Sequence, residues 1–457
     1  MGETPRPGGT LAFRSTHGAL AAGFCLLFVG LAGCTTQNSD LIVGPLQTEP
    51  PRPLPPEVIA AIDARPLGGA SLTSGTRGGG THAEASANQA LYTVSTLAEL
   101  KARVGGDAPA VVLVAEGRYV GAGEPQTLQV CKQPCQSFDP VSEQTVTARF
   151  CTNGEPLFDA TFTTDTLRVG SNKTIIGLGQ GAHLVDISVN LNGSSNVVLR
   201  NLGIEQVQSG VVGTSNALSL EPADHVWLDH LSIRDVSHTA LDIVSTWDEE
   251  NAQALAEESG YLTVSNVHFD GLVSASCSQR SELVLTTNRN PALTITRSWF
   301  EKARIRVPNL LGPGTWAHFF NNLWSDIDGR GLAVSCGAVA LAQGNVFQTT
   351  HNALYNSDSG TPTWQFCATG YYGGLYAPTA GGDEGNLLDA TSTMNLGGQP
   401  TTGAGLSLPK RLTSGEFEVS APVATGTRSE TYRFTLAPDP AAIAAEVQAE
   451  AGVGHLF

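Results

Sequence analysis

The chain has 457 residues, of which 41% are hydrophobic and only 15% are charged, and it contains 51 glycines. This composition is typical of a chain with many turns and few exposed helices, and the length allows one large domain or two ordinary ones. The formal net charge of −17 argues against nucleic acid as a partner, and it disfavours a polyanionic substrate unless a cation or a local arginine patch intervenes. We expect a monomer.

The start of the chain resembles an export signal. An apolar run at 19–32 follows a positively charged beginning and leads into Leu-Ala-Gly-Cys at 31–34, which is similar to the lipobox of a bacterial lipoprotein. We therefore predict a lipoprotein signal peptide at 1–33 and lipidation of Cys34. The alternatives are an ordinary signal peptide or an anchored helix, although the run is short for a membrane span. We expect the protein in the bacterial cell envelope, anchored by its N-terminal lipid to the outer membrane or the cell surface. The alternative is that it is secreted.

Residues 34–70 are predicted to form a proline-rich tether, because six prolines between 45 and 56 favour an extended chain without a core. A folded domain is expected at 71–457, with a cysteine-containing insertion at 121–165. An even number of cysteines in an exported protein suggests disulfides, whose pairing the sequence does not reveal. Zinc is disfavoured, because no histidine accompanies the insertion's cysteines and a closed site needs four ligands. The six cysteines are Cys131, Cys135, Cys151, Cys277, Cys336 and Cys367.

Two helices are predicted near the ends of this domain. Thr96 and Glu99 have the spacing of a capping box, and Gly105–Gly106 would end the helix that follows. This helix would cover the open end of a solenoid, which otherwise exposes apolar core. Asp439–Pro440 is a favourable start for a final helix that packs back on the domain.

A short unit recurs six times between 196 and 347. Each copy is an apolar strand, a turn residue and a second apolar stretch, as in NVVLRNLGI (196–204). The intervals of 23 to 36 residues suit one coil of a solenoid with a variable loop, and such units bury their apolar faces only when stacked. We predict an all-β fold, a right-handed parallel β-helix with short capping helices and coils from about Ser171 to Phe347. An antiparallel sandwich is disfavoured, because hairpin turn pairs are scarce. The turn residues are Asn201, His230, Asn266, Arg297, Asn321 and Gly344.

An ordered set of segments resembles the pectate lyase superfamily, specifically the calcium-dependent polysaccharide lyases of family 1. Besides the repeats, it includes SNKTIIGLG (171–179), TALDIV (239–244), RVPNLL (306–311) and HFFNNLW (318–324). The matching pieces extend from about residue 70 to 454. The resemblance implies a pectin lyase-like β-helix and a carbon–oxygen lyase that cleaves galacturonan by β-elimination. Pectin or a related polyuronan is then the expected partner.

The implied chemistry needs a base for the C5 proton and cations for the uronate carboxylates. Arg306 matches the family's catalytic arginine, whereas Leu311 stands where a second arginine is expected. The substrate-binding lysine falls near Ser274, and no lysine lies close by. Nearby cations that could partly take over the lost substrate contacts are Arg289, Arg297 and Arg304, of which Arg304 is assigned to substrate binding.

The family's calcium carboxylates are only partly present. They fall on Asn216, His238 and Asp242, of which only Asp242 is a carboxylate and His238 is a poor ligand. Because calcium affinity depends on the charge and number of oxygen ligands, Ca²⁺ is expected at a degraded site. Asp248–Glu250 could supply a displaced site, or form a solvated acidic turn.

Three functions are consistent with this pattern. The first is an exported pectate lyase-type enzyme with Arg306 as base. The second is a β-helix that binds carbohydrate or serves a structural role at the surface after losing its catalysis. The third is a calcium-independent lyase for an esterified or different uronan. The retained Arg306 and Asp242 favour a lyase, and fold alone does not decide function.

Overall fold

The computed structural model describes residues 53–130, 158–207, 216–236, 238–244, 260–272, 282–287, 292–304, 306–311, 315–335, 338–356, 374–376, 386–392, 394–396, 410–412, 416–423 and 426–457. The chain divides into two units, Met1–Pro53 and Leu54–Phe457. All helices and strands given below belong to the second unit.

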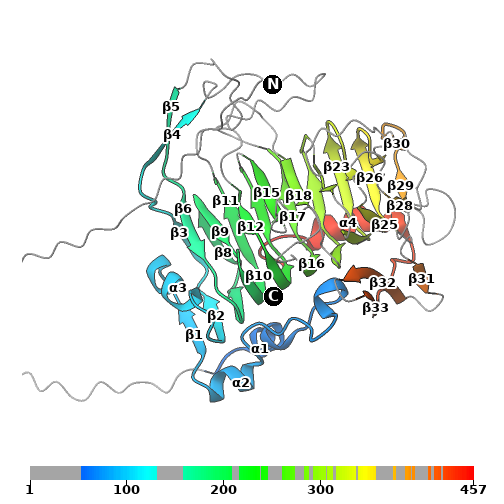
Figure 1. The fold of residues 1–457 in the computed structure, drawn as a ribbon. Helices are drawn as coiled ribbons and strands as arrows, with labels where there is room; N and C mark the ends of the chain where they lie inside the picture. Colours follow the sequence, from blue (N-terminus) through cyan, green and yellow to red (C-terminus); the bar gives the residue numbers. More distant parts are fainter. Residues whose placement is uncertain are drawn as a thin grey trace, which may run out of the picture. The chain divides into compact units, whose positions relative to one another are not determined.

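Three long sheets, whose strands all pair in parallel, form the body of this unit (Figure 1). The chain visits the first, second and third sheet in turn and then begins the next coil, so consecutive coils stack strand on strand. This is the right-handed parallel β-helix predicted from the repeats.

The first sheet contains β1 (Leu91–Val94), β2 (Ala110–Val114), β7 (Lys173–Gly177), β10 (Ser194–Arg200), β13 (Ala223–Asp229), β16 (Gly260–Ser265), β19 (Leu293–Thr296), β22 (Trp316–Phe320), β25 (Val339–Gln343) and β28 (Gly374–Tyr376). The second contains β3 (Gly117–Val120), β8 (Ala182–Val185), β11 (Leu202–Glu205), β14 (Ser232–Arg234), β17 (His268–Asp270), β20 (Trp299–Glu301), β23 (Leu323–Ile327), β26 (Val346–Thr350) and β29 (Leu387–Leu388). The third contains β6 (Asp165–Arg168), β9 (Ile187–Asn190), β12 (Leu218–Leu220), β15 (Thr239–Val244), β18 (Glu282–Thr287), β21 (Asn309–Leu310), β24 (Leu332–Val334), β27 (Leu354–Asn356) and β30 (Met394–Leu396).

The remaining elements are antiparallel strands and short helices. A hairpin of β4 (Gln126–Val130) and β5 (Phe158–Phe162) flanks the undescribed part of the predicted insertion. A second antiparallel sheet consists of β31 (Lys410–Leu412), β32 (Glu416–Val423) and β33 (Gly426–Arg433). The helices are α1 (Pro56–Asp63), the 3₁₀ helix η1 (Gly68–Ser71), α2 (His82–Ala87), α3 (Leu97–Val104) and α4 (Pro440–Glu450).

The turn residue of each repeat marks the bend from the first sheet to the second. All six adopt the left-handed backbone conformation, with φ between +49° and +58°. Asparagine and glycine tolerate this region far better than most residues, which explains why the repeats favour asparagine here. At Arg297 (φ +49°) the coil imposes the same bend on a less suited residue. The residue type at this turn position is therefore determined mainly by the left-handed backbone conformation and less by side-chain hydrogen bonds.

The stacked polar ladder lies one residue after this turn position. Asn345 donates from Nδ2 to Asn386 Oδ1 over 2.8 Å, and Asn322 donates to Asn345 Oδ1 over 2.9 Å. Each of these asparagines also donates to a backbone carbonyl, and all three are at most 2% exposed. In earlier coils the same position is apolar at Leu231 and Val267, and the next coil has the buried Ser298, whose hydroxyl accepts from the Val267 amide over 3.2 Å. The ladder thus satisfies buried polar groups only in the later coils.

Aromatic residues fill the interior of those same coils. Phe269, Phe300, Trp324 and Phe347 occupy equivalent positions in the second sheet and stack with ring centroids 4.6 to 5.0 Å apart. Parallel stacking places like residues above like, so an aromatic in one coil favours an aromatic in the next. The coils extend beyond the predicted end near Phe347, because β28, β29 and β30 continue all three sheets.

The predicted tether at 34–70 is wrong in its last part. From Leu54 onward the chain belongs to the β-helix unit. In α1, Val58 and Ile62 are spaced one helical turn apart and pack on Val111 and Ile176 of the first sheet. The prolines therefore start a helix with Pro56 at its first position, a favoured place for proline.

The segment after α1 lies flat on the first sheet. In η1, the amides of Gly69 and Ala70 donate to the hydroxyls of Thr294 and Thr263, over 2.9 and 3.0 Å. A Cβ on Gly69 would lie 1.9 Å from the carbonyl oxygen of Ala292, so only glycine allows this approach.

The two predicted capping helices are present. Thr96 and Glu99 form the expected capping box at α3, whose Leu100 and Val104 are buried in the core. Asp439 caps α4 through the Ala441 amide, and Ile443 and Val447 pack on Leu323 and Val346 of the second sheet. The cysteines of the insertion, and the other predicted disulfide partners, lie outside the described residues.

The asparagine ladder should contribute measurably to stability. Replacing Asn345 with alanine leaves the buried groups of Asn322 and Asn386 without their partner, so we expect a loss of about 3 kcal/mol in the free energy of unfolding. Denaturant unfolding followed by circular dichroism measures it. The exposed Asn88→Ala serves as control and should change stability by no more than about 0.5 kcal/mol. A loss of stability in Asn345→Ala as small as that in the control would show that the ladder does not contribute to stability.

Candidate functional site

The third sheet brings together the three residues assigned to the cation site. Along its strands Leu218 and Leu241 are fully buried, so the intervening Ser219 and Asp242 face outward, and these two are register partners. Asn216 lies just before β12, and His238 lies just before β15. Both residues therefore reach the outer face of the sheet beside Asp242.

These three side chains form a hydrogen-bonded chain. Asn216 Nδ2 donates to Asp242 Oδ2 over 2.6 Å, and Asn216 Oδ1 lies 2.8 Å from His238 Nδ1. An ionised carboxylate can only accept, so the amide nitrogen faces Asp242 and His238 donates from Nδ1. Ser188 Oγ also donates to the backbone carbonyl of Asn216 over 2.7 Å. The side-chain amide of Asn216 is thus oriented by Asp242 at its nitrogen and by His238 at its oxygen.

This donor set does not fit calcium. Calcium takes about six to eight oxygen ligands, with carboxylates supplying most of the charge. Here one carboxylate faces an amide N–H₂ group, and the third residue offers an imidazole. Among the described residues, no group of three or more His, Cys, Asp or Glu side chains is placed to hold a metal ion. The alternative ligands at Asp248–Glu250 lie outside the described residues.

Arg306, the predicted base, lies immediately before β21 of the same sheet. Asn309 pairs with Leu285, which pairs with Asp242. The Arg306 strand is therefore two strands from Asp242, about 10 Å along the sheet. Arg306 is half-buried and adopts a left-handed backbone conformation with φ +59°. Because many turns of this β-helix share that conformation, it reflects the coil and not a special strain of the site.

The residues around Arg306 differ in their access to a polymer. Arg304 is 8% exposed, so little of its guanidinium is open, and its assignment to substrate binding stays a prediction. Leu311, at the position expected to carry a second arginine, is buried with 4% of its surface exposed. One coil further on, the Arg330 guanidinium lies 4.1 Å above the Tyr355 ring. Tyr355 belongs to the same outward row as Asn309, and no sequence motif singled it out.

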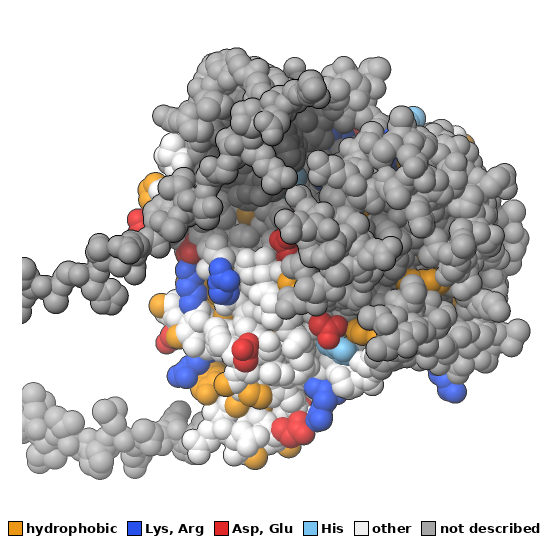
Figure 2. All heavy atoms as spheres, in the orientation of Figure 1, with side chains coloured by type: hydrophobic (Ala, Val, Ile, Leu, Met, Phe, Trp, Pro, Cys, Tyr) orange, Lys and Arg blue, Asp and Glu red, His pale blue; other side chains and the backbone are white. Residues whose placement is uncertain are grey.

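Two predicted positions lie outside the described residues, namely the substrate-binding position Ser274 and the lipidation position Cys34. On the face shown in Figure 2, the acidic and basic side chains of the described residues are scattered over the surface. Neither sign forms a broad patch among the described atoms in that view.

Comparisons with known proteins agree with this architecture. A family model described as pectate lyase matches residues 155–370. The chain is 31% identical over 198 residues to a probable pectin lyase F of Emericella nidulans, which covers 42% of this chain and 40% of that protein. It is 28% identical over 407 residues to a probable pectin lyase F-2 of Aspergillus terreus, which covers 86% of this chain and 75% of the relative. Together, these matches support a member of the pectate lyase superfamily and an activity of the polysaccharide lyase class.

Solved structures show the same fold. A pectate lyase variant from Xanthomonas campestris aligns with a TM-score of 0.50 at 18% identity, over 85% of this chain and 98% of that one. A pectate lyase from Acidovorax avenae aligns with a TM-score of 0.50 at 16% identity, over 86% and 95%. At such identities the likeness concerns the β-helix of this superfamily member and not its active site.

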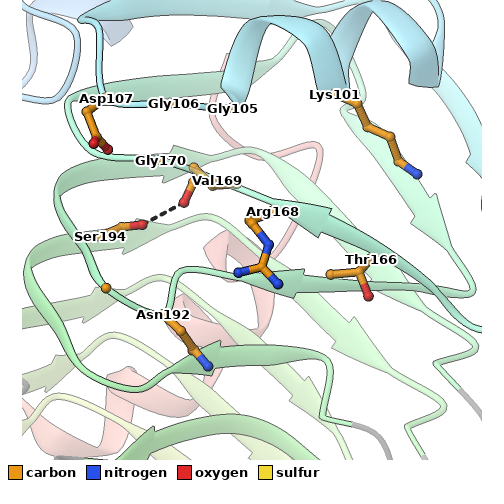
Figure 3. A pocket seen from close by; sticks show the side chains of 11 residues that line it. Lys101, Gly105, Gly106, Asp107, Thr166, Arg168, Val169, Gly170, Asn192 and Ser194 are labelled. Carbon is orange, nitrogen blue, oxygen red and sulfur yellow. Dashed lines mark hydrogen bonds between the residues drawn. The ribbon is translucent and has the colours of Figure 1, made fainter. Parts of the chain in front are cut away.

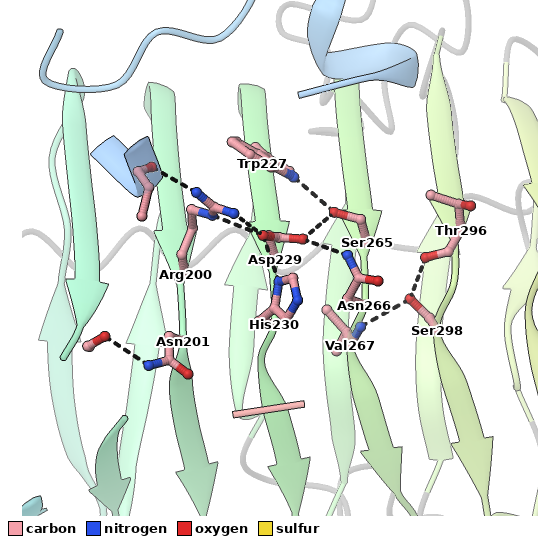
Figure 4. Close-up of polar contacts among 12 residues, drawn as sticks. Arg200, Asn201, Trp227, Asp229, His230, Ser265, Asn266, Val267, Thr296 and Ser298 are labelled. Carbon is pink, nitrogen blue, oxygen red and sulfur yellow. Dashed lines mark hydrogen bonds and ion pairs between the residues drawn. The ribbon is translucent and has the colours of Figure 1, made fainter. Parts of the chain in front are cut away.

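A second polar cluster of this lyase-family chain lies on the first sheet (Figure 4). The Asp229 carboxylate accepts from Arg200, His230, Ser265 and Asn266 over 2.6 to 3.0 Å. Arg200 also donates to the carbonyl of Ala61 in α1 over 2.7 Å. Asp229 is 1% exposed, so this cluster has a structural role and ties α1 to the coils.

These contacts shift the titration of Asp229. Burial alone would raise the pKa, but the hydrogen bond and charge of His230 and the charge of Arg200 outweigh it and lower the pKa to about 2. A carboxyl with a folded pKa below its unfolded value of about 3.9 stabilises the fold fully above that value. The contribution is then lost as the pH falls from about 4 towards 2.

This titration predicts that the contact between α1 and the coils weakens in acid. Asp229→Asn should lower stability at pH 7 by about 3 kcal/mol or more, because it leaves the buried Arg200 charge uncompensated. It should also flatten the decline in stability between pH 4 and 2, as measured by denaturant unfolding at a series of pH values. Glu221→Gln, at an exposed carboxyl just before the same strand, is the matched control. An unchanged acid profile in Asp229→Asn would assign the decline to other carboxyls.

Proposed function

We propose that this chain cleaves methyl-esterified galacturonan, that is pectin, by β-elimination without calcium. The observation that carries the proposal is the Asn216–Asp242–His238 chain, which stands where calcium carboxylates were expected. The names of the pectin lyases to which the chain is similar support the same polymer.

The absence of calcium ligands matters because of the charge on the substrate. In unesterified galacturonan the carboxylate beside C5 is negative, and a cation must neutralise it before the C5 proton becomes acidic. A methyl ester withdraws electrons without carrying a charge, so it needs no bound cation. A site with one carboxylate and two neutral hydrogen-bonding groups therefore suits an ester better than a carboxylate. The chain's net charge of −17 also repels an ester less than a polyanion.

Arg306 is the residue we assign to proton abstraction. In the elimination, the C5–H bond breaks and its proton passes to Arg306, the electron pair forms a C4=C5 double bond, and the C4–O4 bond breaks. The leaving O4 takes a proton from water. The hydrogen-bonded Asn216 and Asp242, which lie two strands away in the same sheet, would contact the sugar ring and orient it.

We further propose that the enzyme is exported and held at the cell envelope by a lipid on Cys34. The support is the apolar run and the Leu-Ala-Gly-Cys sequence at 31–34. Within the described residues, none of the helices has the length and apolar character of a membrane span. An anchored enzyme would act on polymer outside the cell.

Arg306 should be essential for product formation. Arg306→Ala removes the base, and we expect kcat/KM on methylated pectin to fall about 10³-fold. Ultraviolet absorbance of the unsaturated product measures the rate. Arg297→Ala is a matched control, because Arg297 has the same left-handed backbone but pairs with Glu446 and Glu450 at the surface. If the wild-type protein forms no product but is retained on a pectin column, the proposed lyase activity would be wrong. The protein would then be a carbohydrate-binding β-helix.

The wild-type enzyme should not need calcium, and substitutions at the candidate site should create calcium binding. A chelator should leave the rate on methylated pectin unchanged. Asn216→Asp combined with His238→Asp restores three carboxylates around one point, and this variant should bind Ca²⁺ measurably by calorimetry while the wild type does not. Loss of activity with chelator and its recovery with calcium would overturn the proposed calcium independence.

A further inference from the structure

A hollow of about 420 Å³ opens beside the first coils of the third sheet (Figure 3). It lies between the end of α3, strand β6 and the turn that follows β9, and Lys101, Thr166, Arg168 and Asn192 are among the residues that line it. Its volume is in the range of small-ligand sites. The superfamily resemblance assigned no role to any of these residues.

Arg168 is the cation that this hollow offers to a ligand. Lys101 is engaged by Asp165 at 2.6 Å, and the nearby Asp107 accepts from the Ser171 amide at 2.9 Å. Arg168 is exposed, and it has no hydrogen bond or ion pair within the part of the chain that the structure describes. A planar guanidinium pairs with a carboxylate through two parallel hydrogen bonds.

The surroundings of Arg168 also favour an anion. Lys101 pairs with Asp165, and Asp107 interacts with the charge of Lys173, so Arg168 leaves one net positive charge at the hollow. The whole chain, in contrast, carries a net charge of −17. Behind the hollow, the ammonium of Lys173 is buried and donates to the carbonyls of Gly106 and Ala108 over 2.7 Å each. The hollow is therefore a locally positive site on an acidic protein.

The register connects this hollow to the candidate active site. Arg168 pairs with Asn190, Asn190 with Ser219, and Ser219 with Asp242. The residues before them (Leu167, Val189, Leu218 and Leu241) are all buried, so all four partners face outward in one row. Three strand steps separate Arg168 from Asp242, about 14 Å. Because sugar units of a 1,4-linked chain repeat at a spacing similar to that of strands, a polymer along this row would reach Arg168 about three units from Asp242.

We propose that Arg168 binds the free carboxylate of a uronate about three sugar units from the Asp242 site. The inference rests on the proposed function, and it specifies the substrate as a partly esterified polymer. Such a polymer has an ester where the bond is cleaved and a free carboxylate at the hollow. Asn192 and Thr166 would donate further hydrogen bonds to the same sugar.

Binding measured without catalysis tests this inference. Calorimetric titrations of the Arg306→Ala chain would use fully methyl-esterified hexagalacturonate and a counterpart that has one free carboxylate, on the unit expected at Arg168. We expect a chain with Arg168 to bind the hexamer with the free carboxylate about tenfold more tightly than the full ester, which corresponds to one charge-assisted hydrogen-bonded pair. Adding Arg168→Ala should remove that preference, and Arg168→Lys should retain part of it. Arg65→Ala, at an exposed arginine beside α1, should retain all of it.

The outcomes separate this inference from the proposed function. An unchanged preference in Arg168→Ala would overturn the inference, whether or not the wild type forms unsaturated product. An equal loss of affinity for both hexamers would also overturn it, because a carboxylate partner cannot act on the ester. A preference lost only with Arg168 would support it, even if the lyase assay gave no product.

Discussion

The parallel register between successive coils is the constraint on which the rest of this structure depends. Every coil must return its strands to the same three sheets, about 4.8 Å further along. The backbone meets this demand with left-handed bends, which occur at Asn201, His230 and Asn266 and at their counterparts in later coils. Once the register is set, each side chain lies beside its equivalent in the next coil. The asparagine ladder and the stacked aromatic rings are direct results.

The same register arranges the functional face. Inside the third sheet the stacked positions are apolar, and outside they form a row that includes Arg168, Asn190, Ser219 and Asp242. A linear polymer that lies along this row meets one side chain per strand. If the proposed function holds, substrate recognition is a linear array of contacts, and a change at one strand affects one sugar unit. Asp242 and Arg168 would then read different units of a single chain.

The candidate site departs from the pattern of its superfamily in a consistent way. Asn216 and His238 stand at carboxylate positions, and they bond to Asp242 and to each other instead of leaving oxygens for a cation. Leu311 replaces a second arginine and is buried. These changes all reduce the capacity to neutralise a substrate carboxylate, while Arg306, the group that would take the proton, is retained. An esterified unit at the cleaved bond reconciles the lost cations with the retained base.

The sequence by itself determined the fold class, the capping helix α3 and the C-terminal helix α4, because apolar periodicity and capping residues act locally. It also led to predictions of the residues at the family's catalytic and cation positions, which stay predictions. It missed α1 and η1, because six prolines suggested a tether and the stabilising contacts, such as Arg200 with Ala61, join distant segments. Only the tertiary structure decided that Asn216 turns its amide nitrogen to Asp242 and that Arg168 shares a row with Asp242. Both depend on strand register, a long-range property that no local pattern specifies.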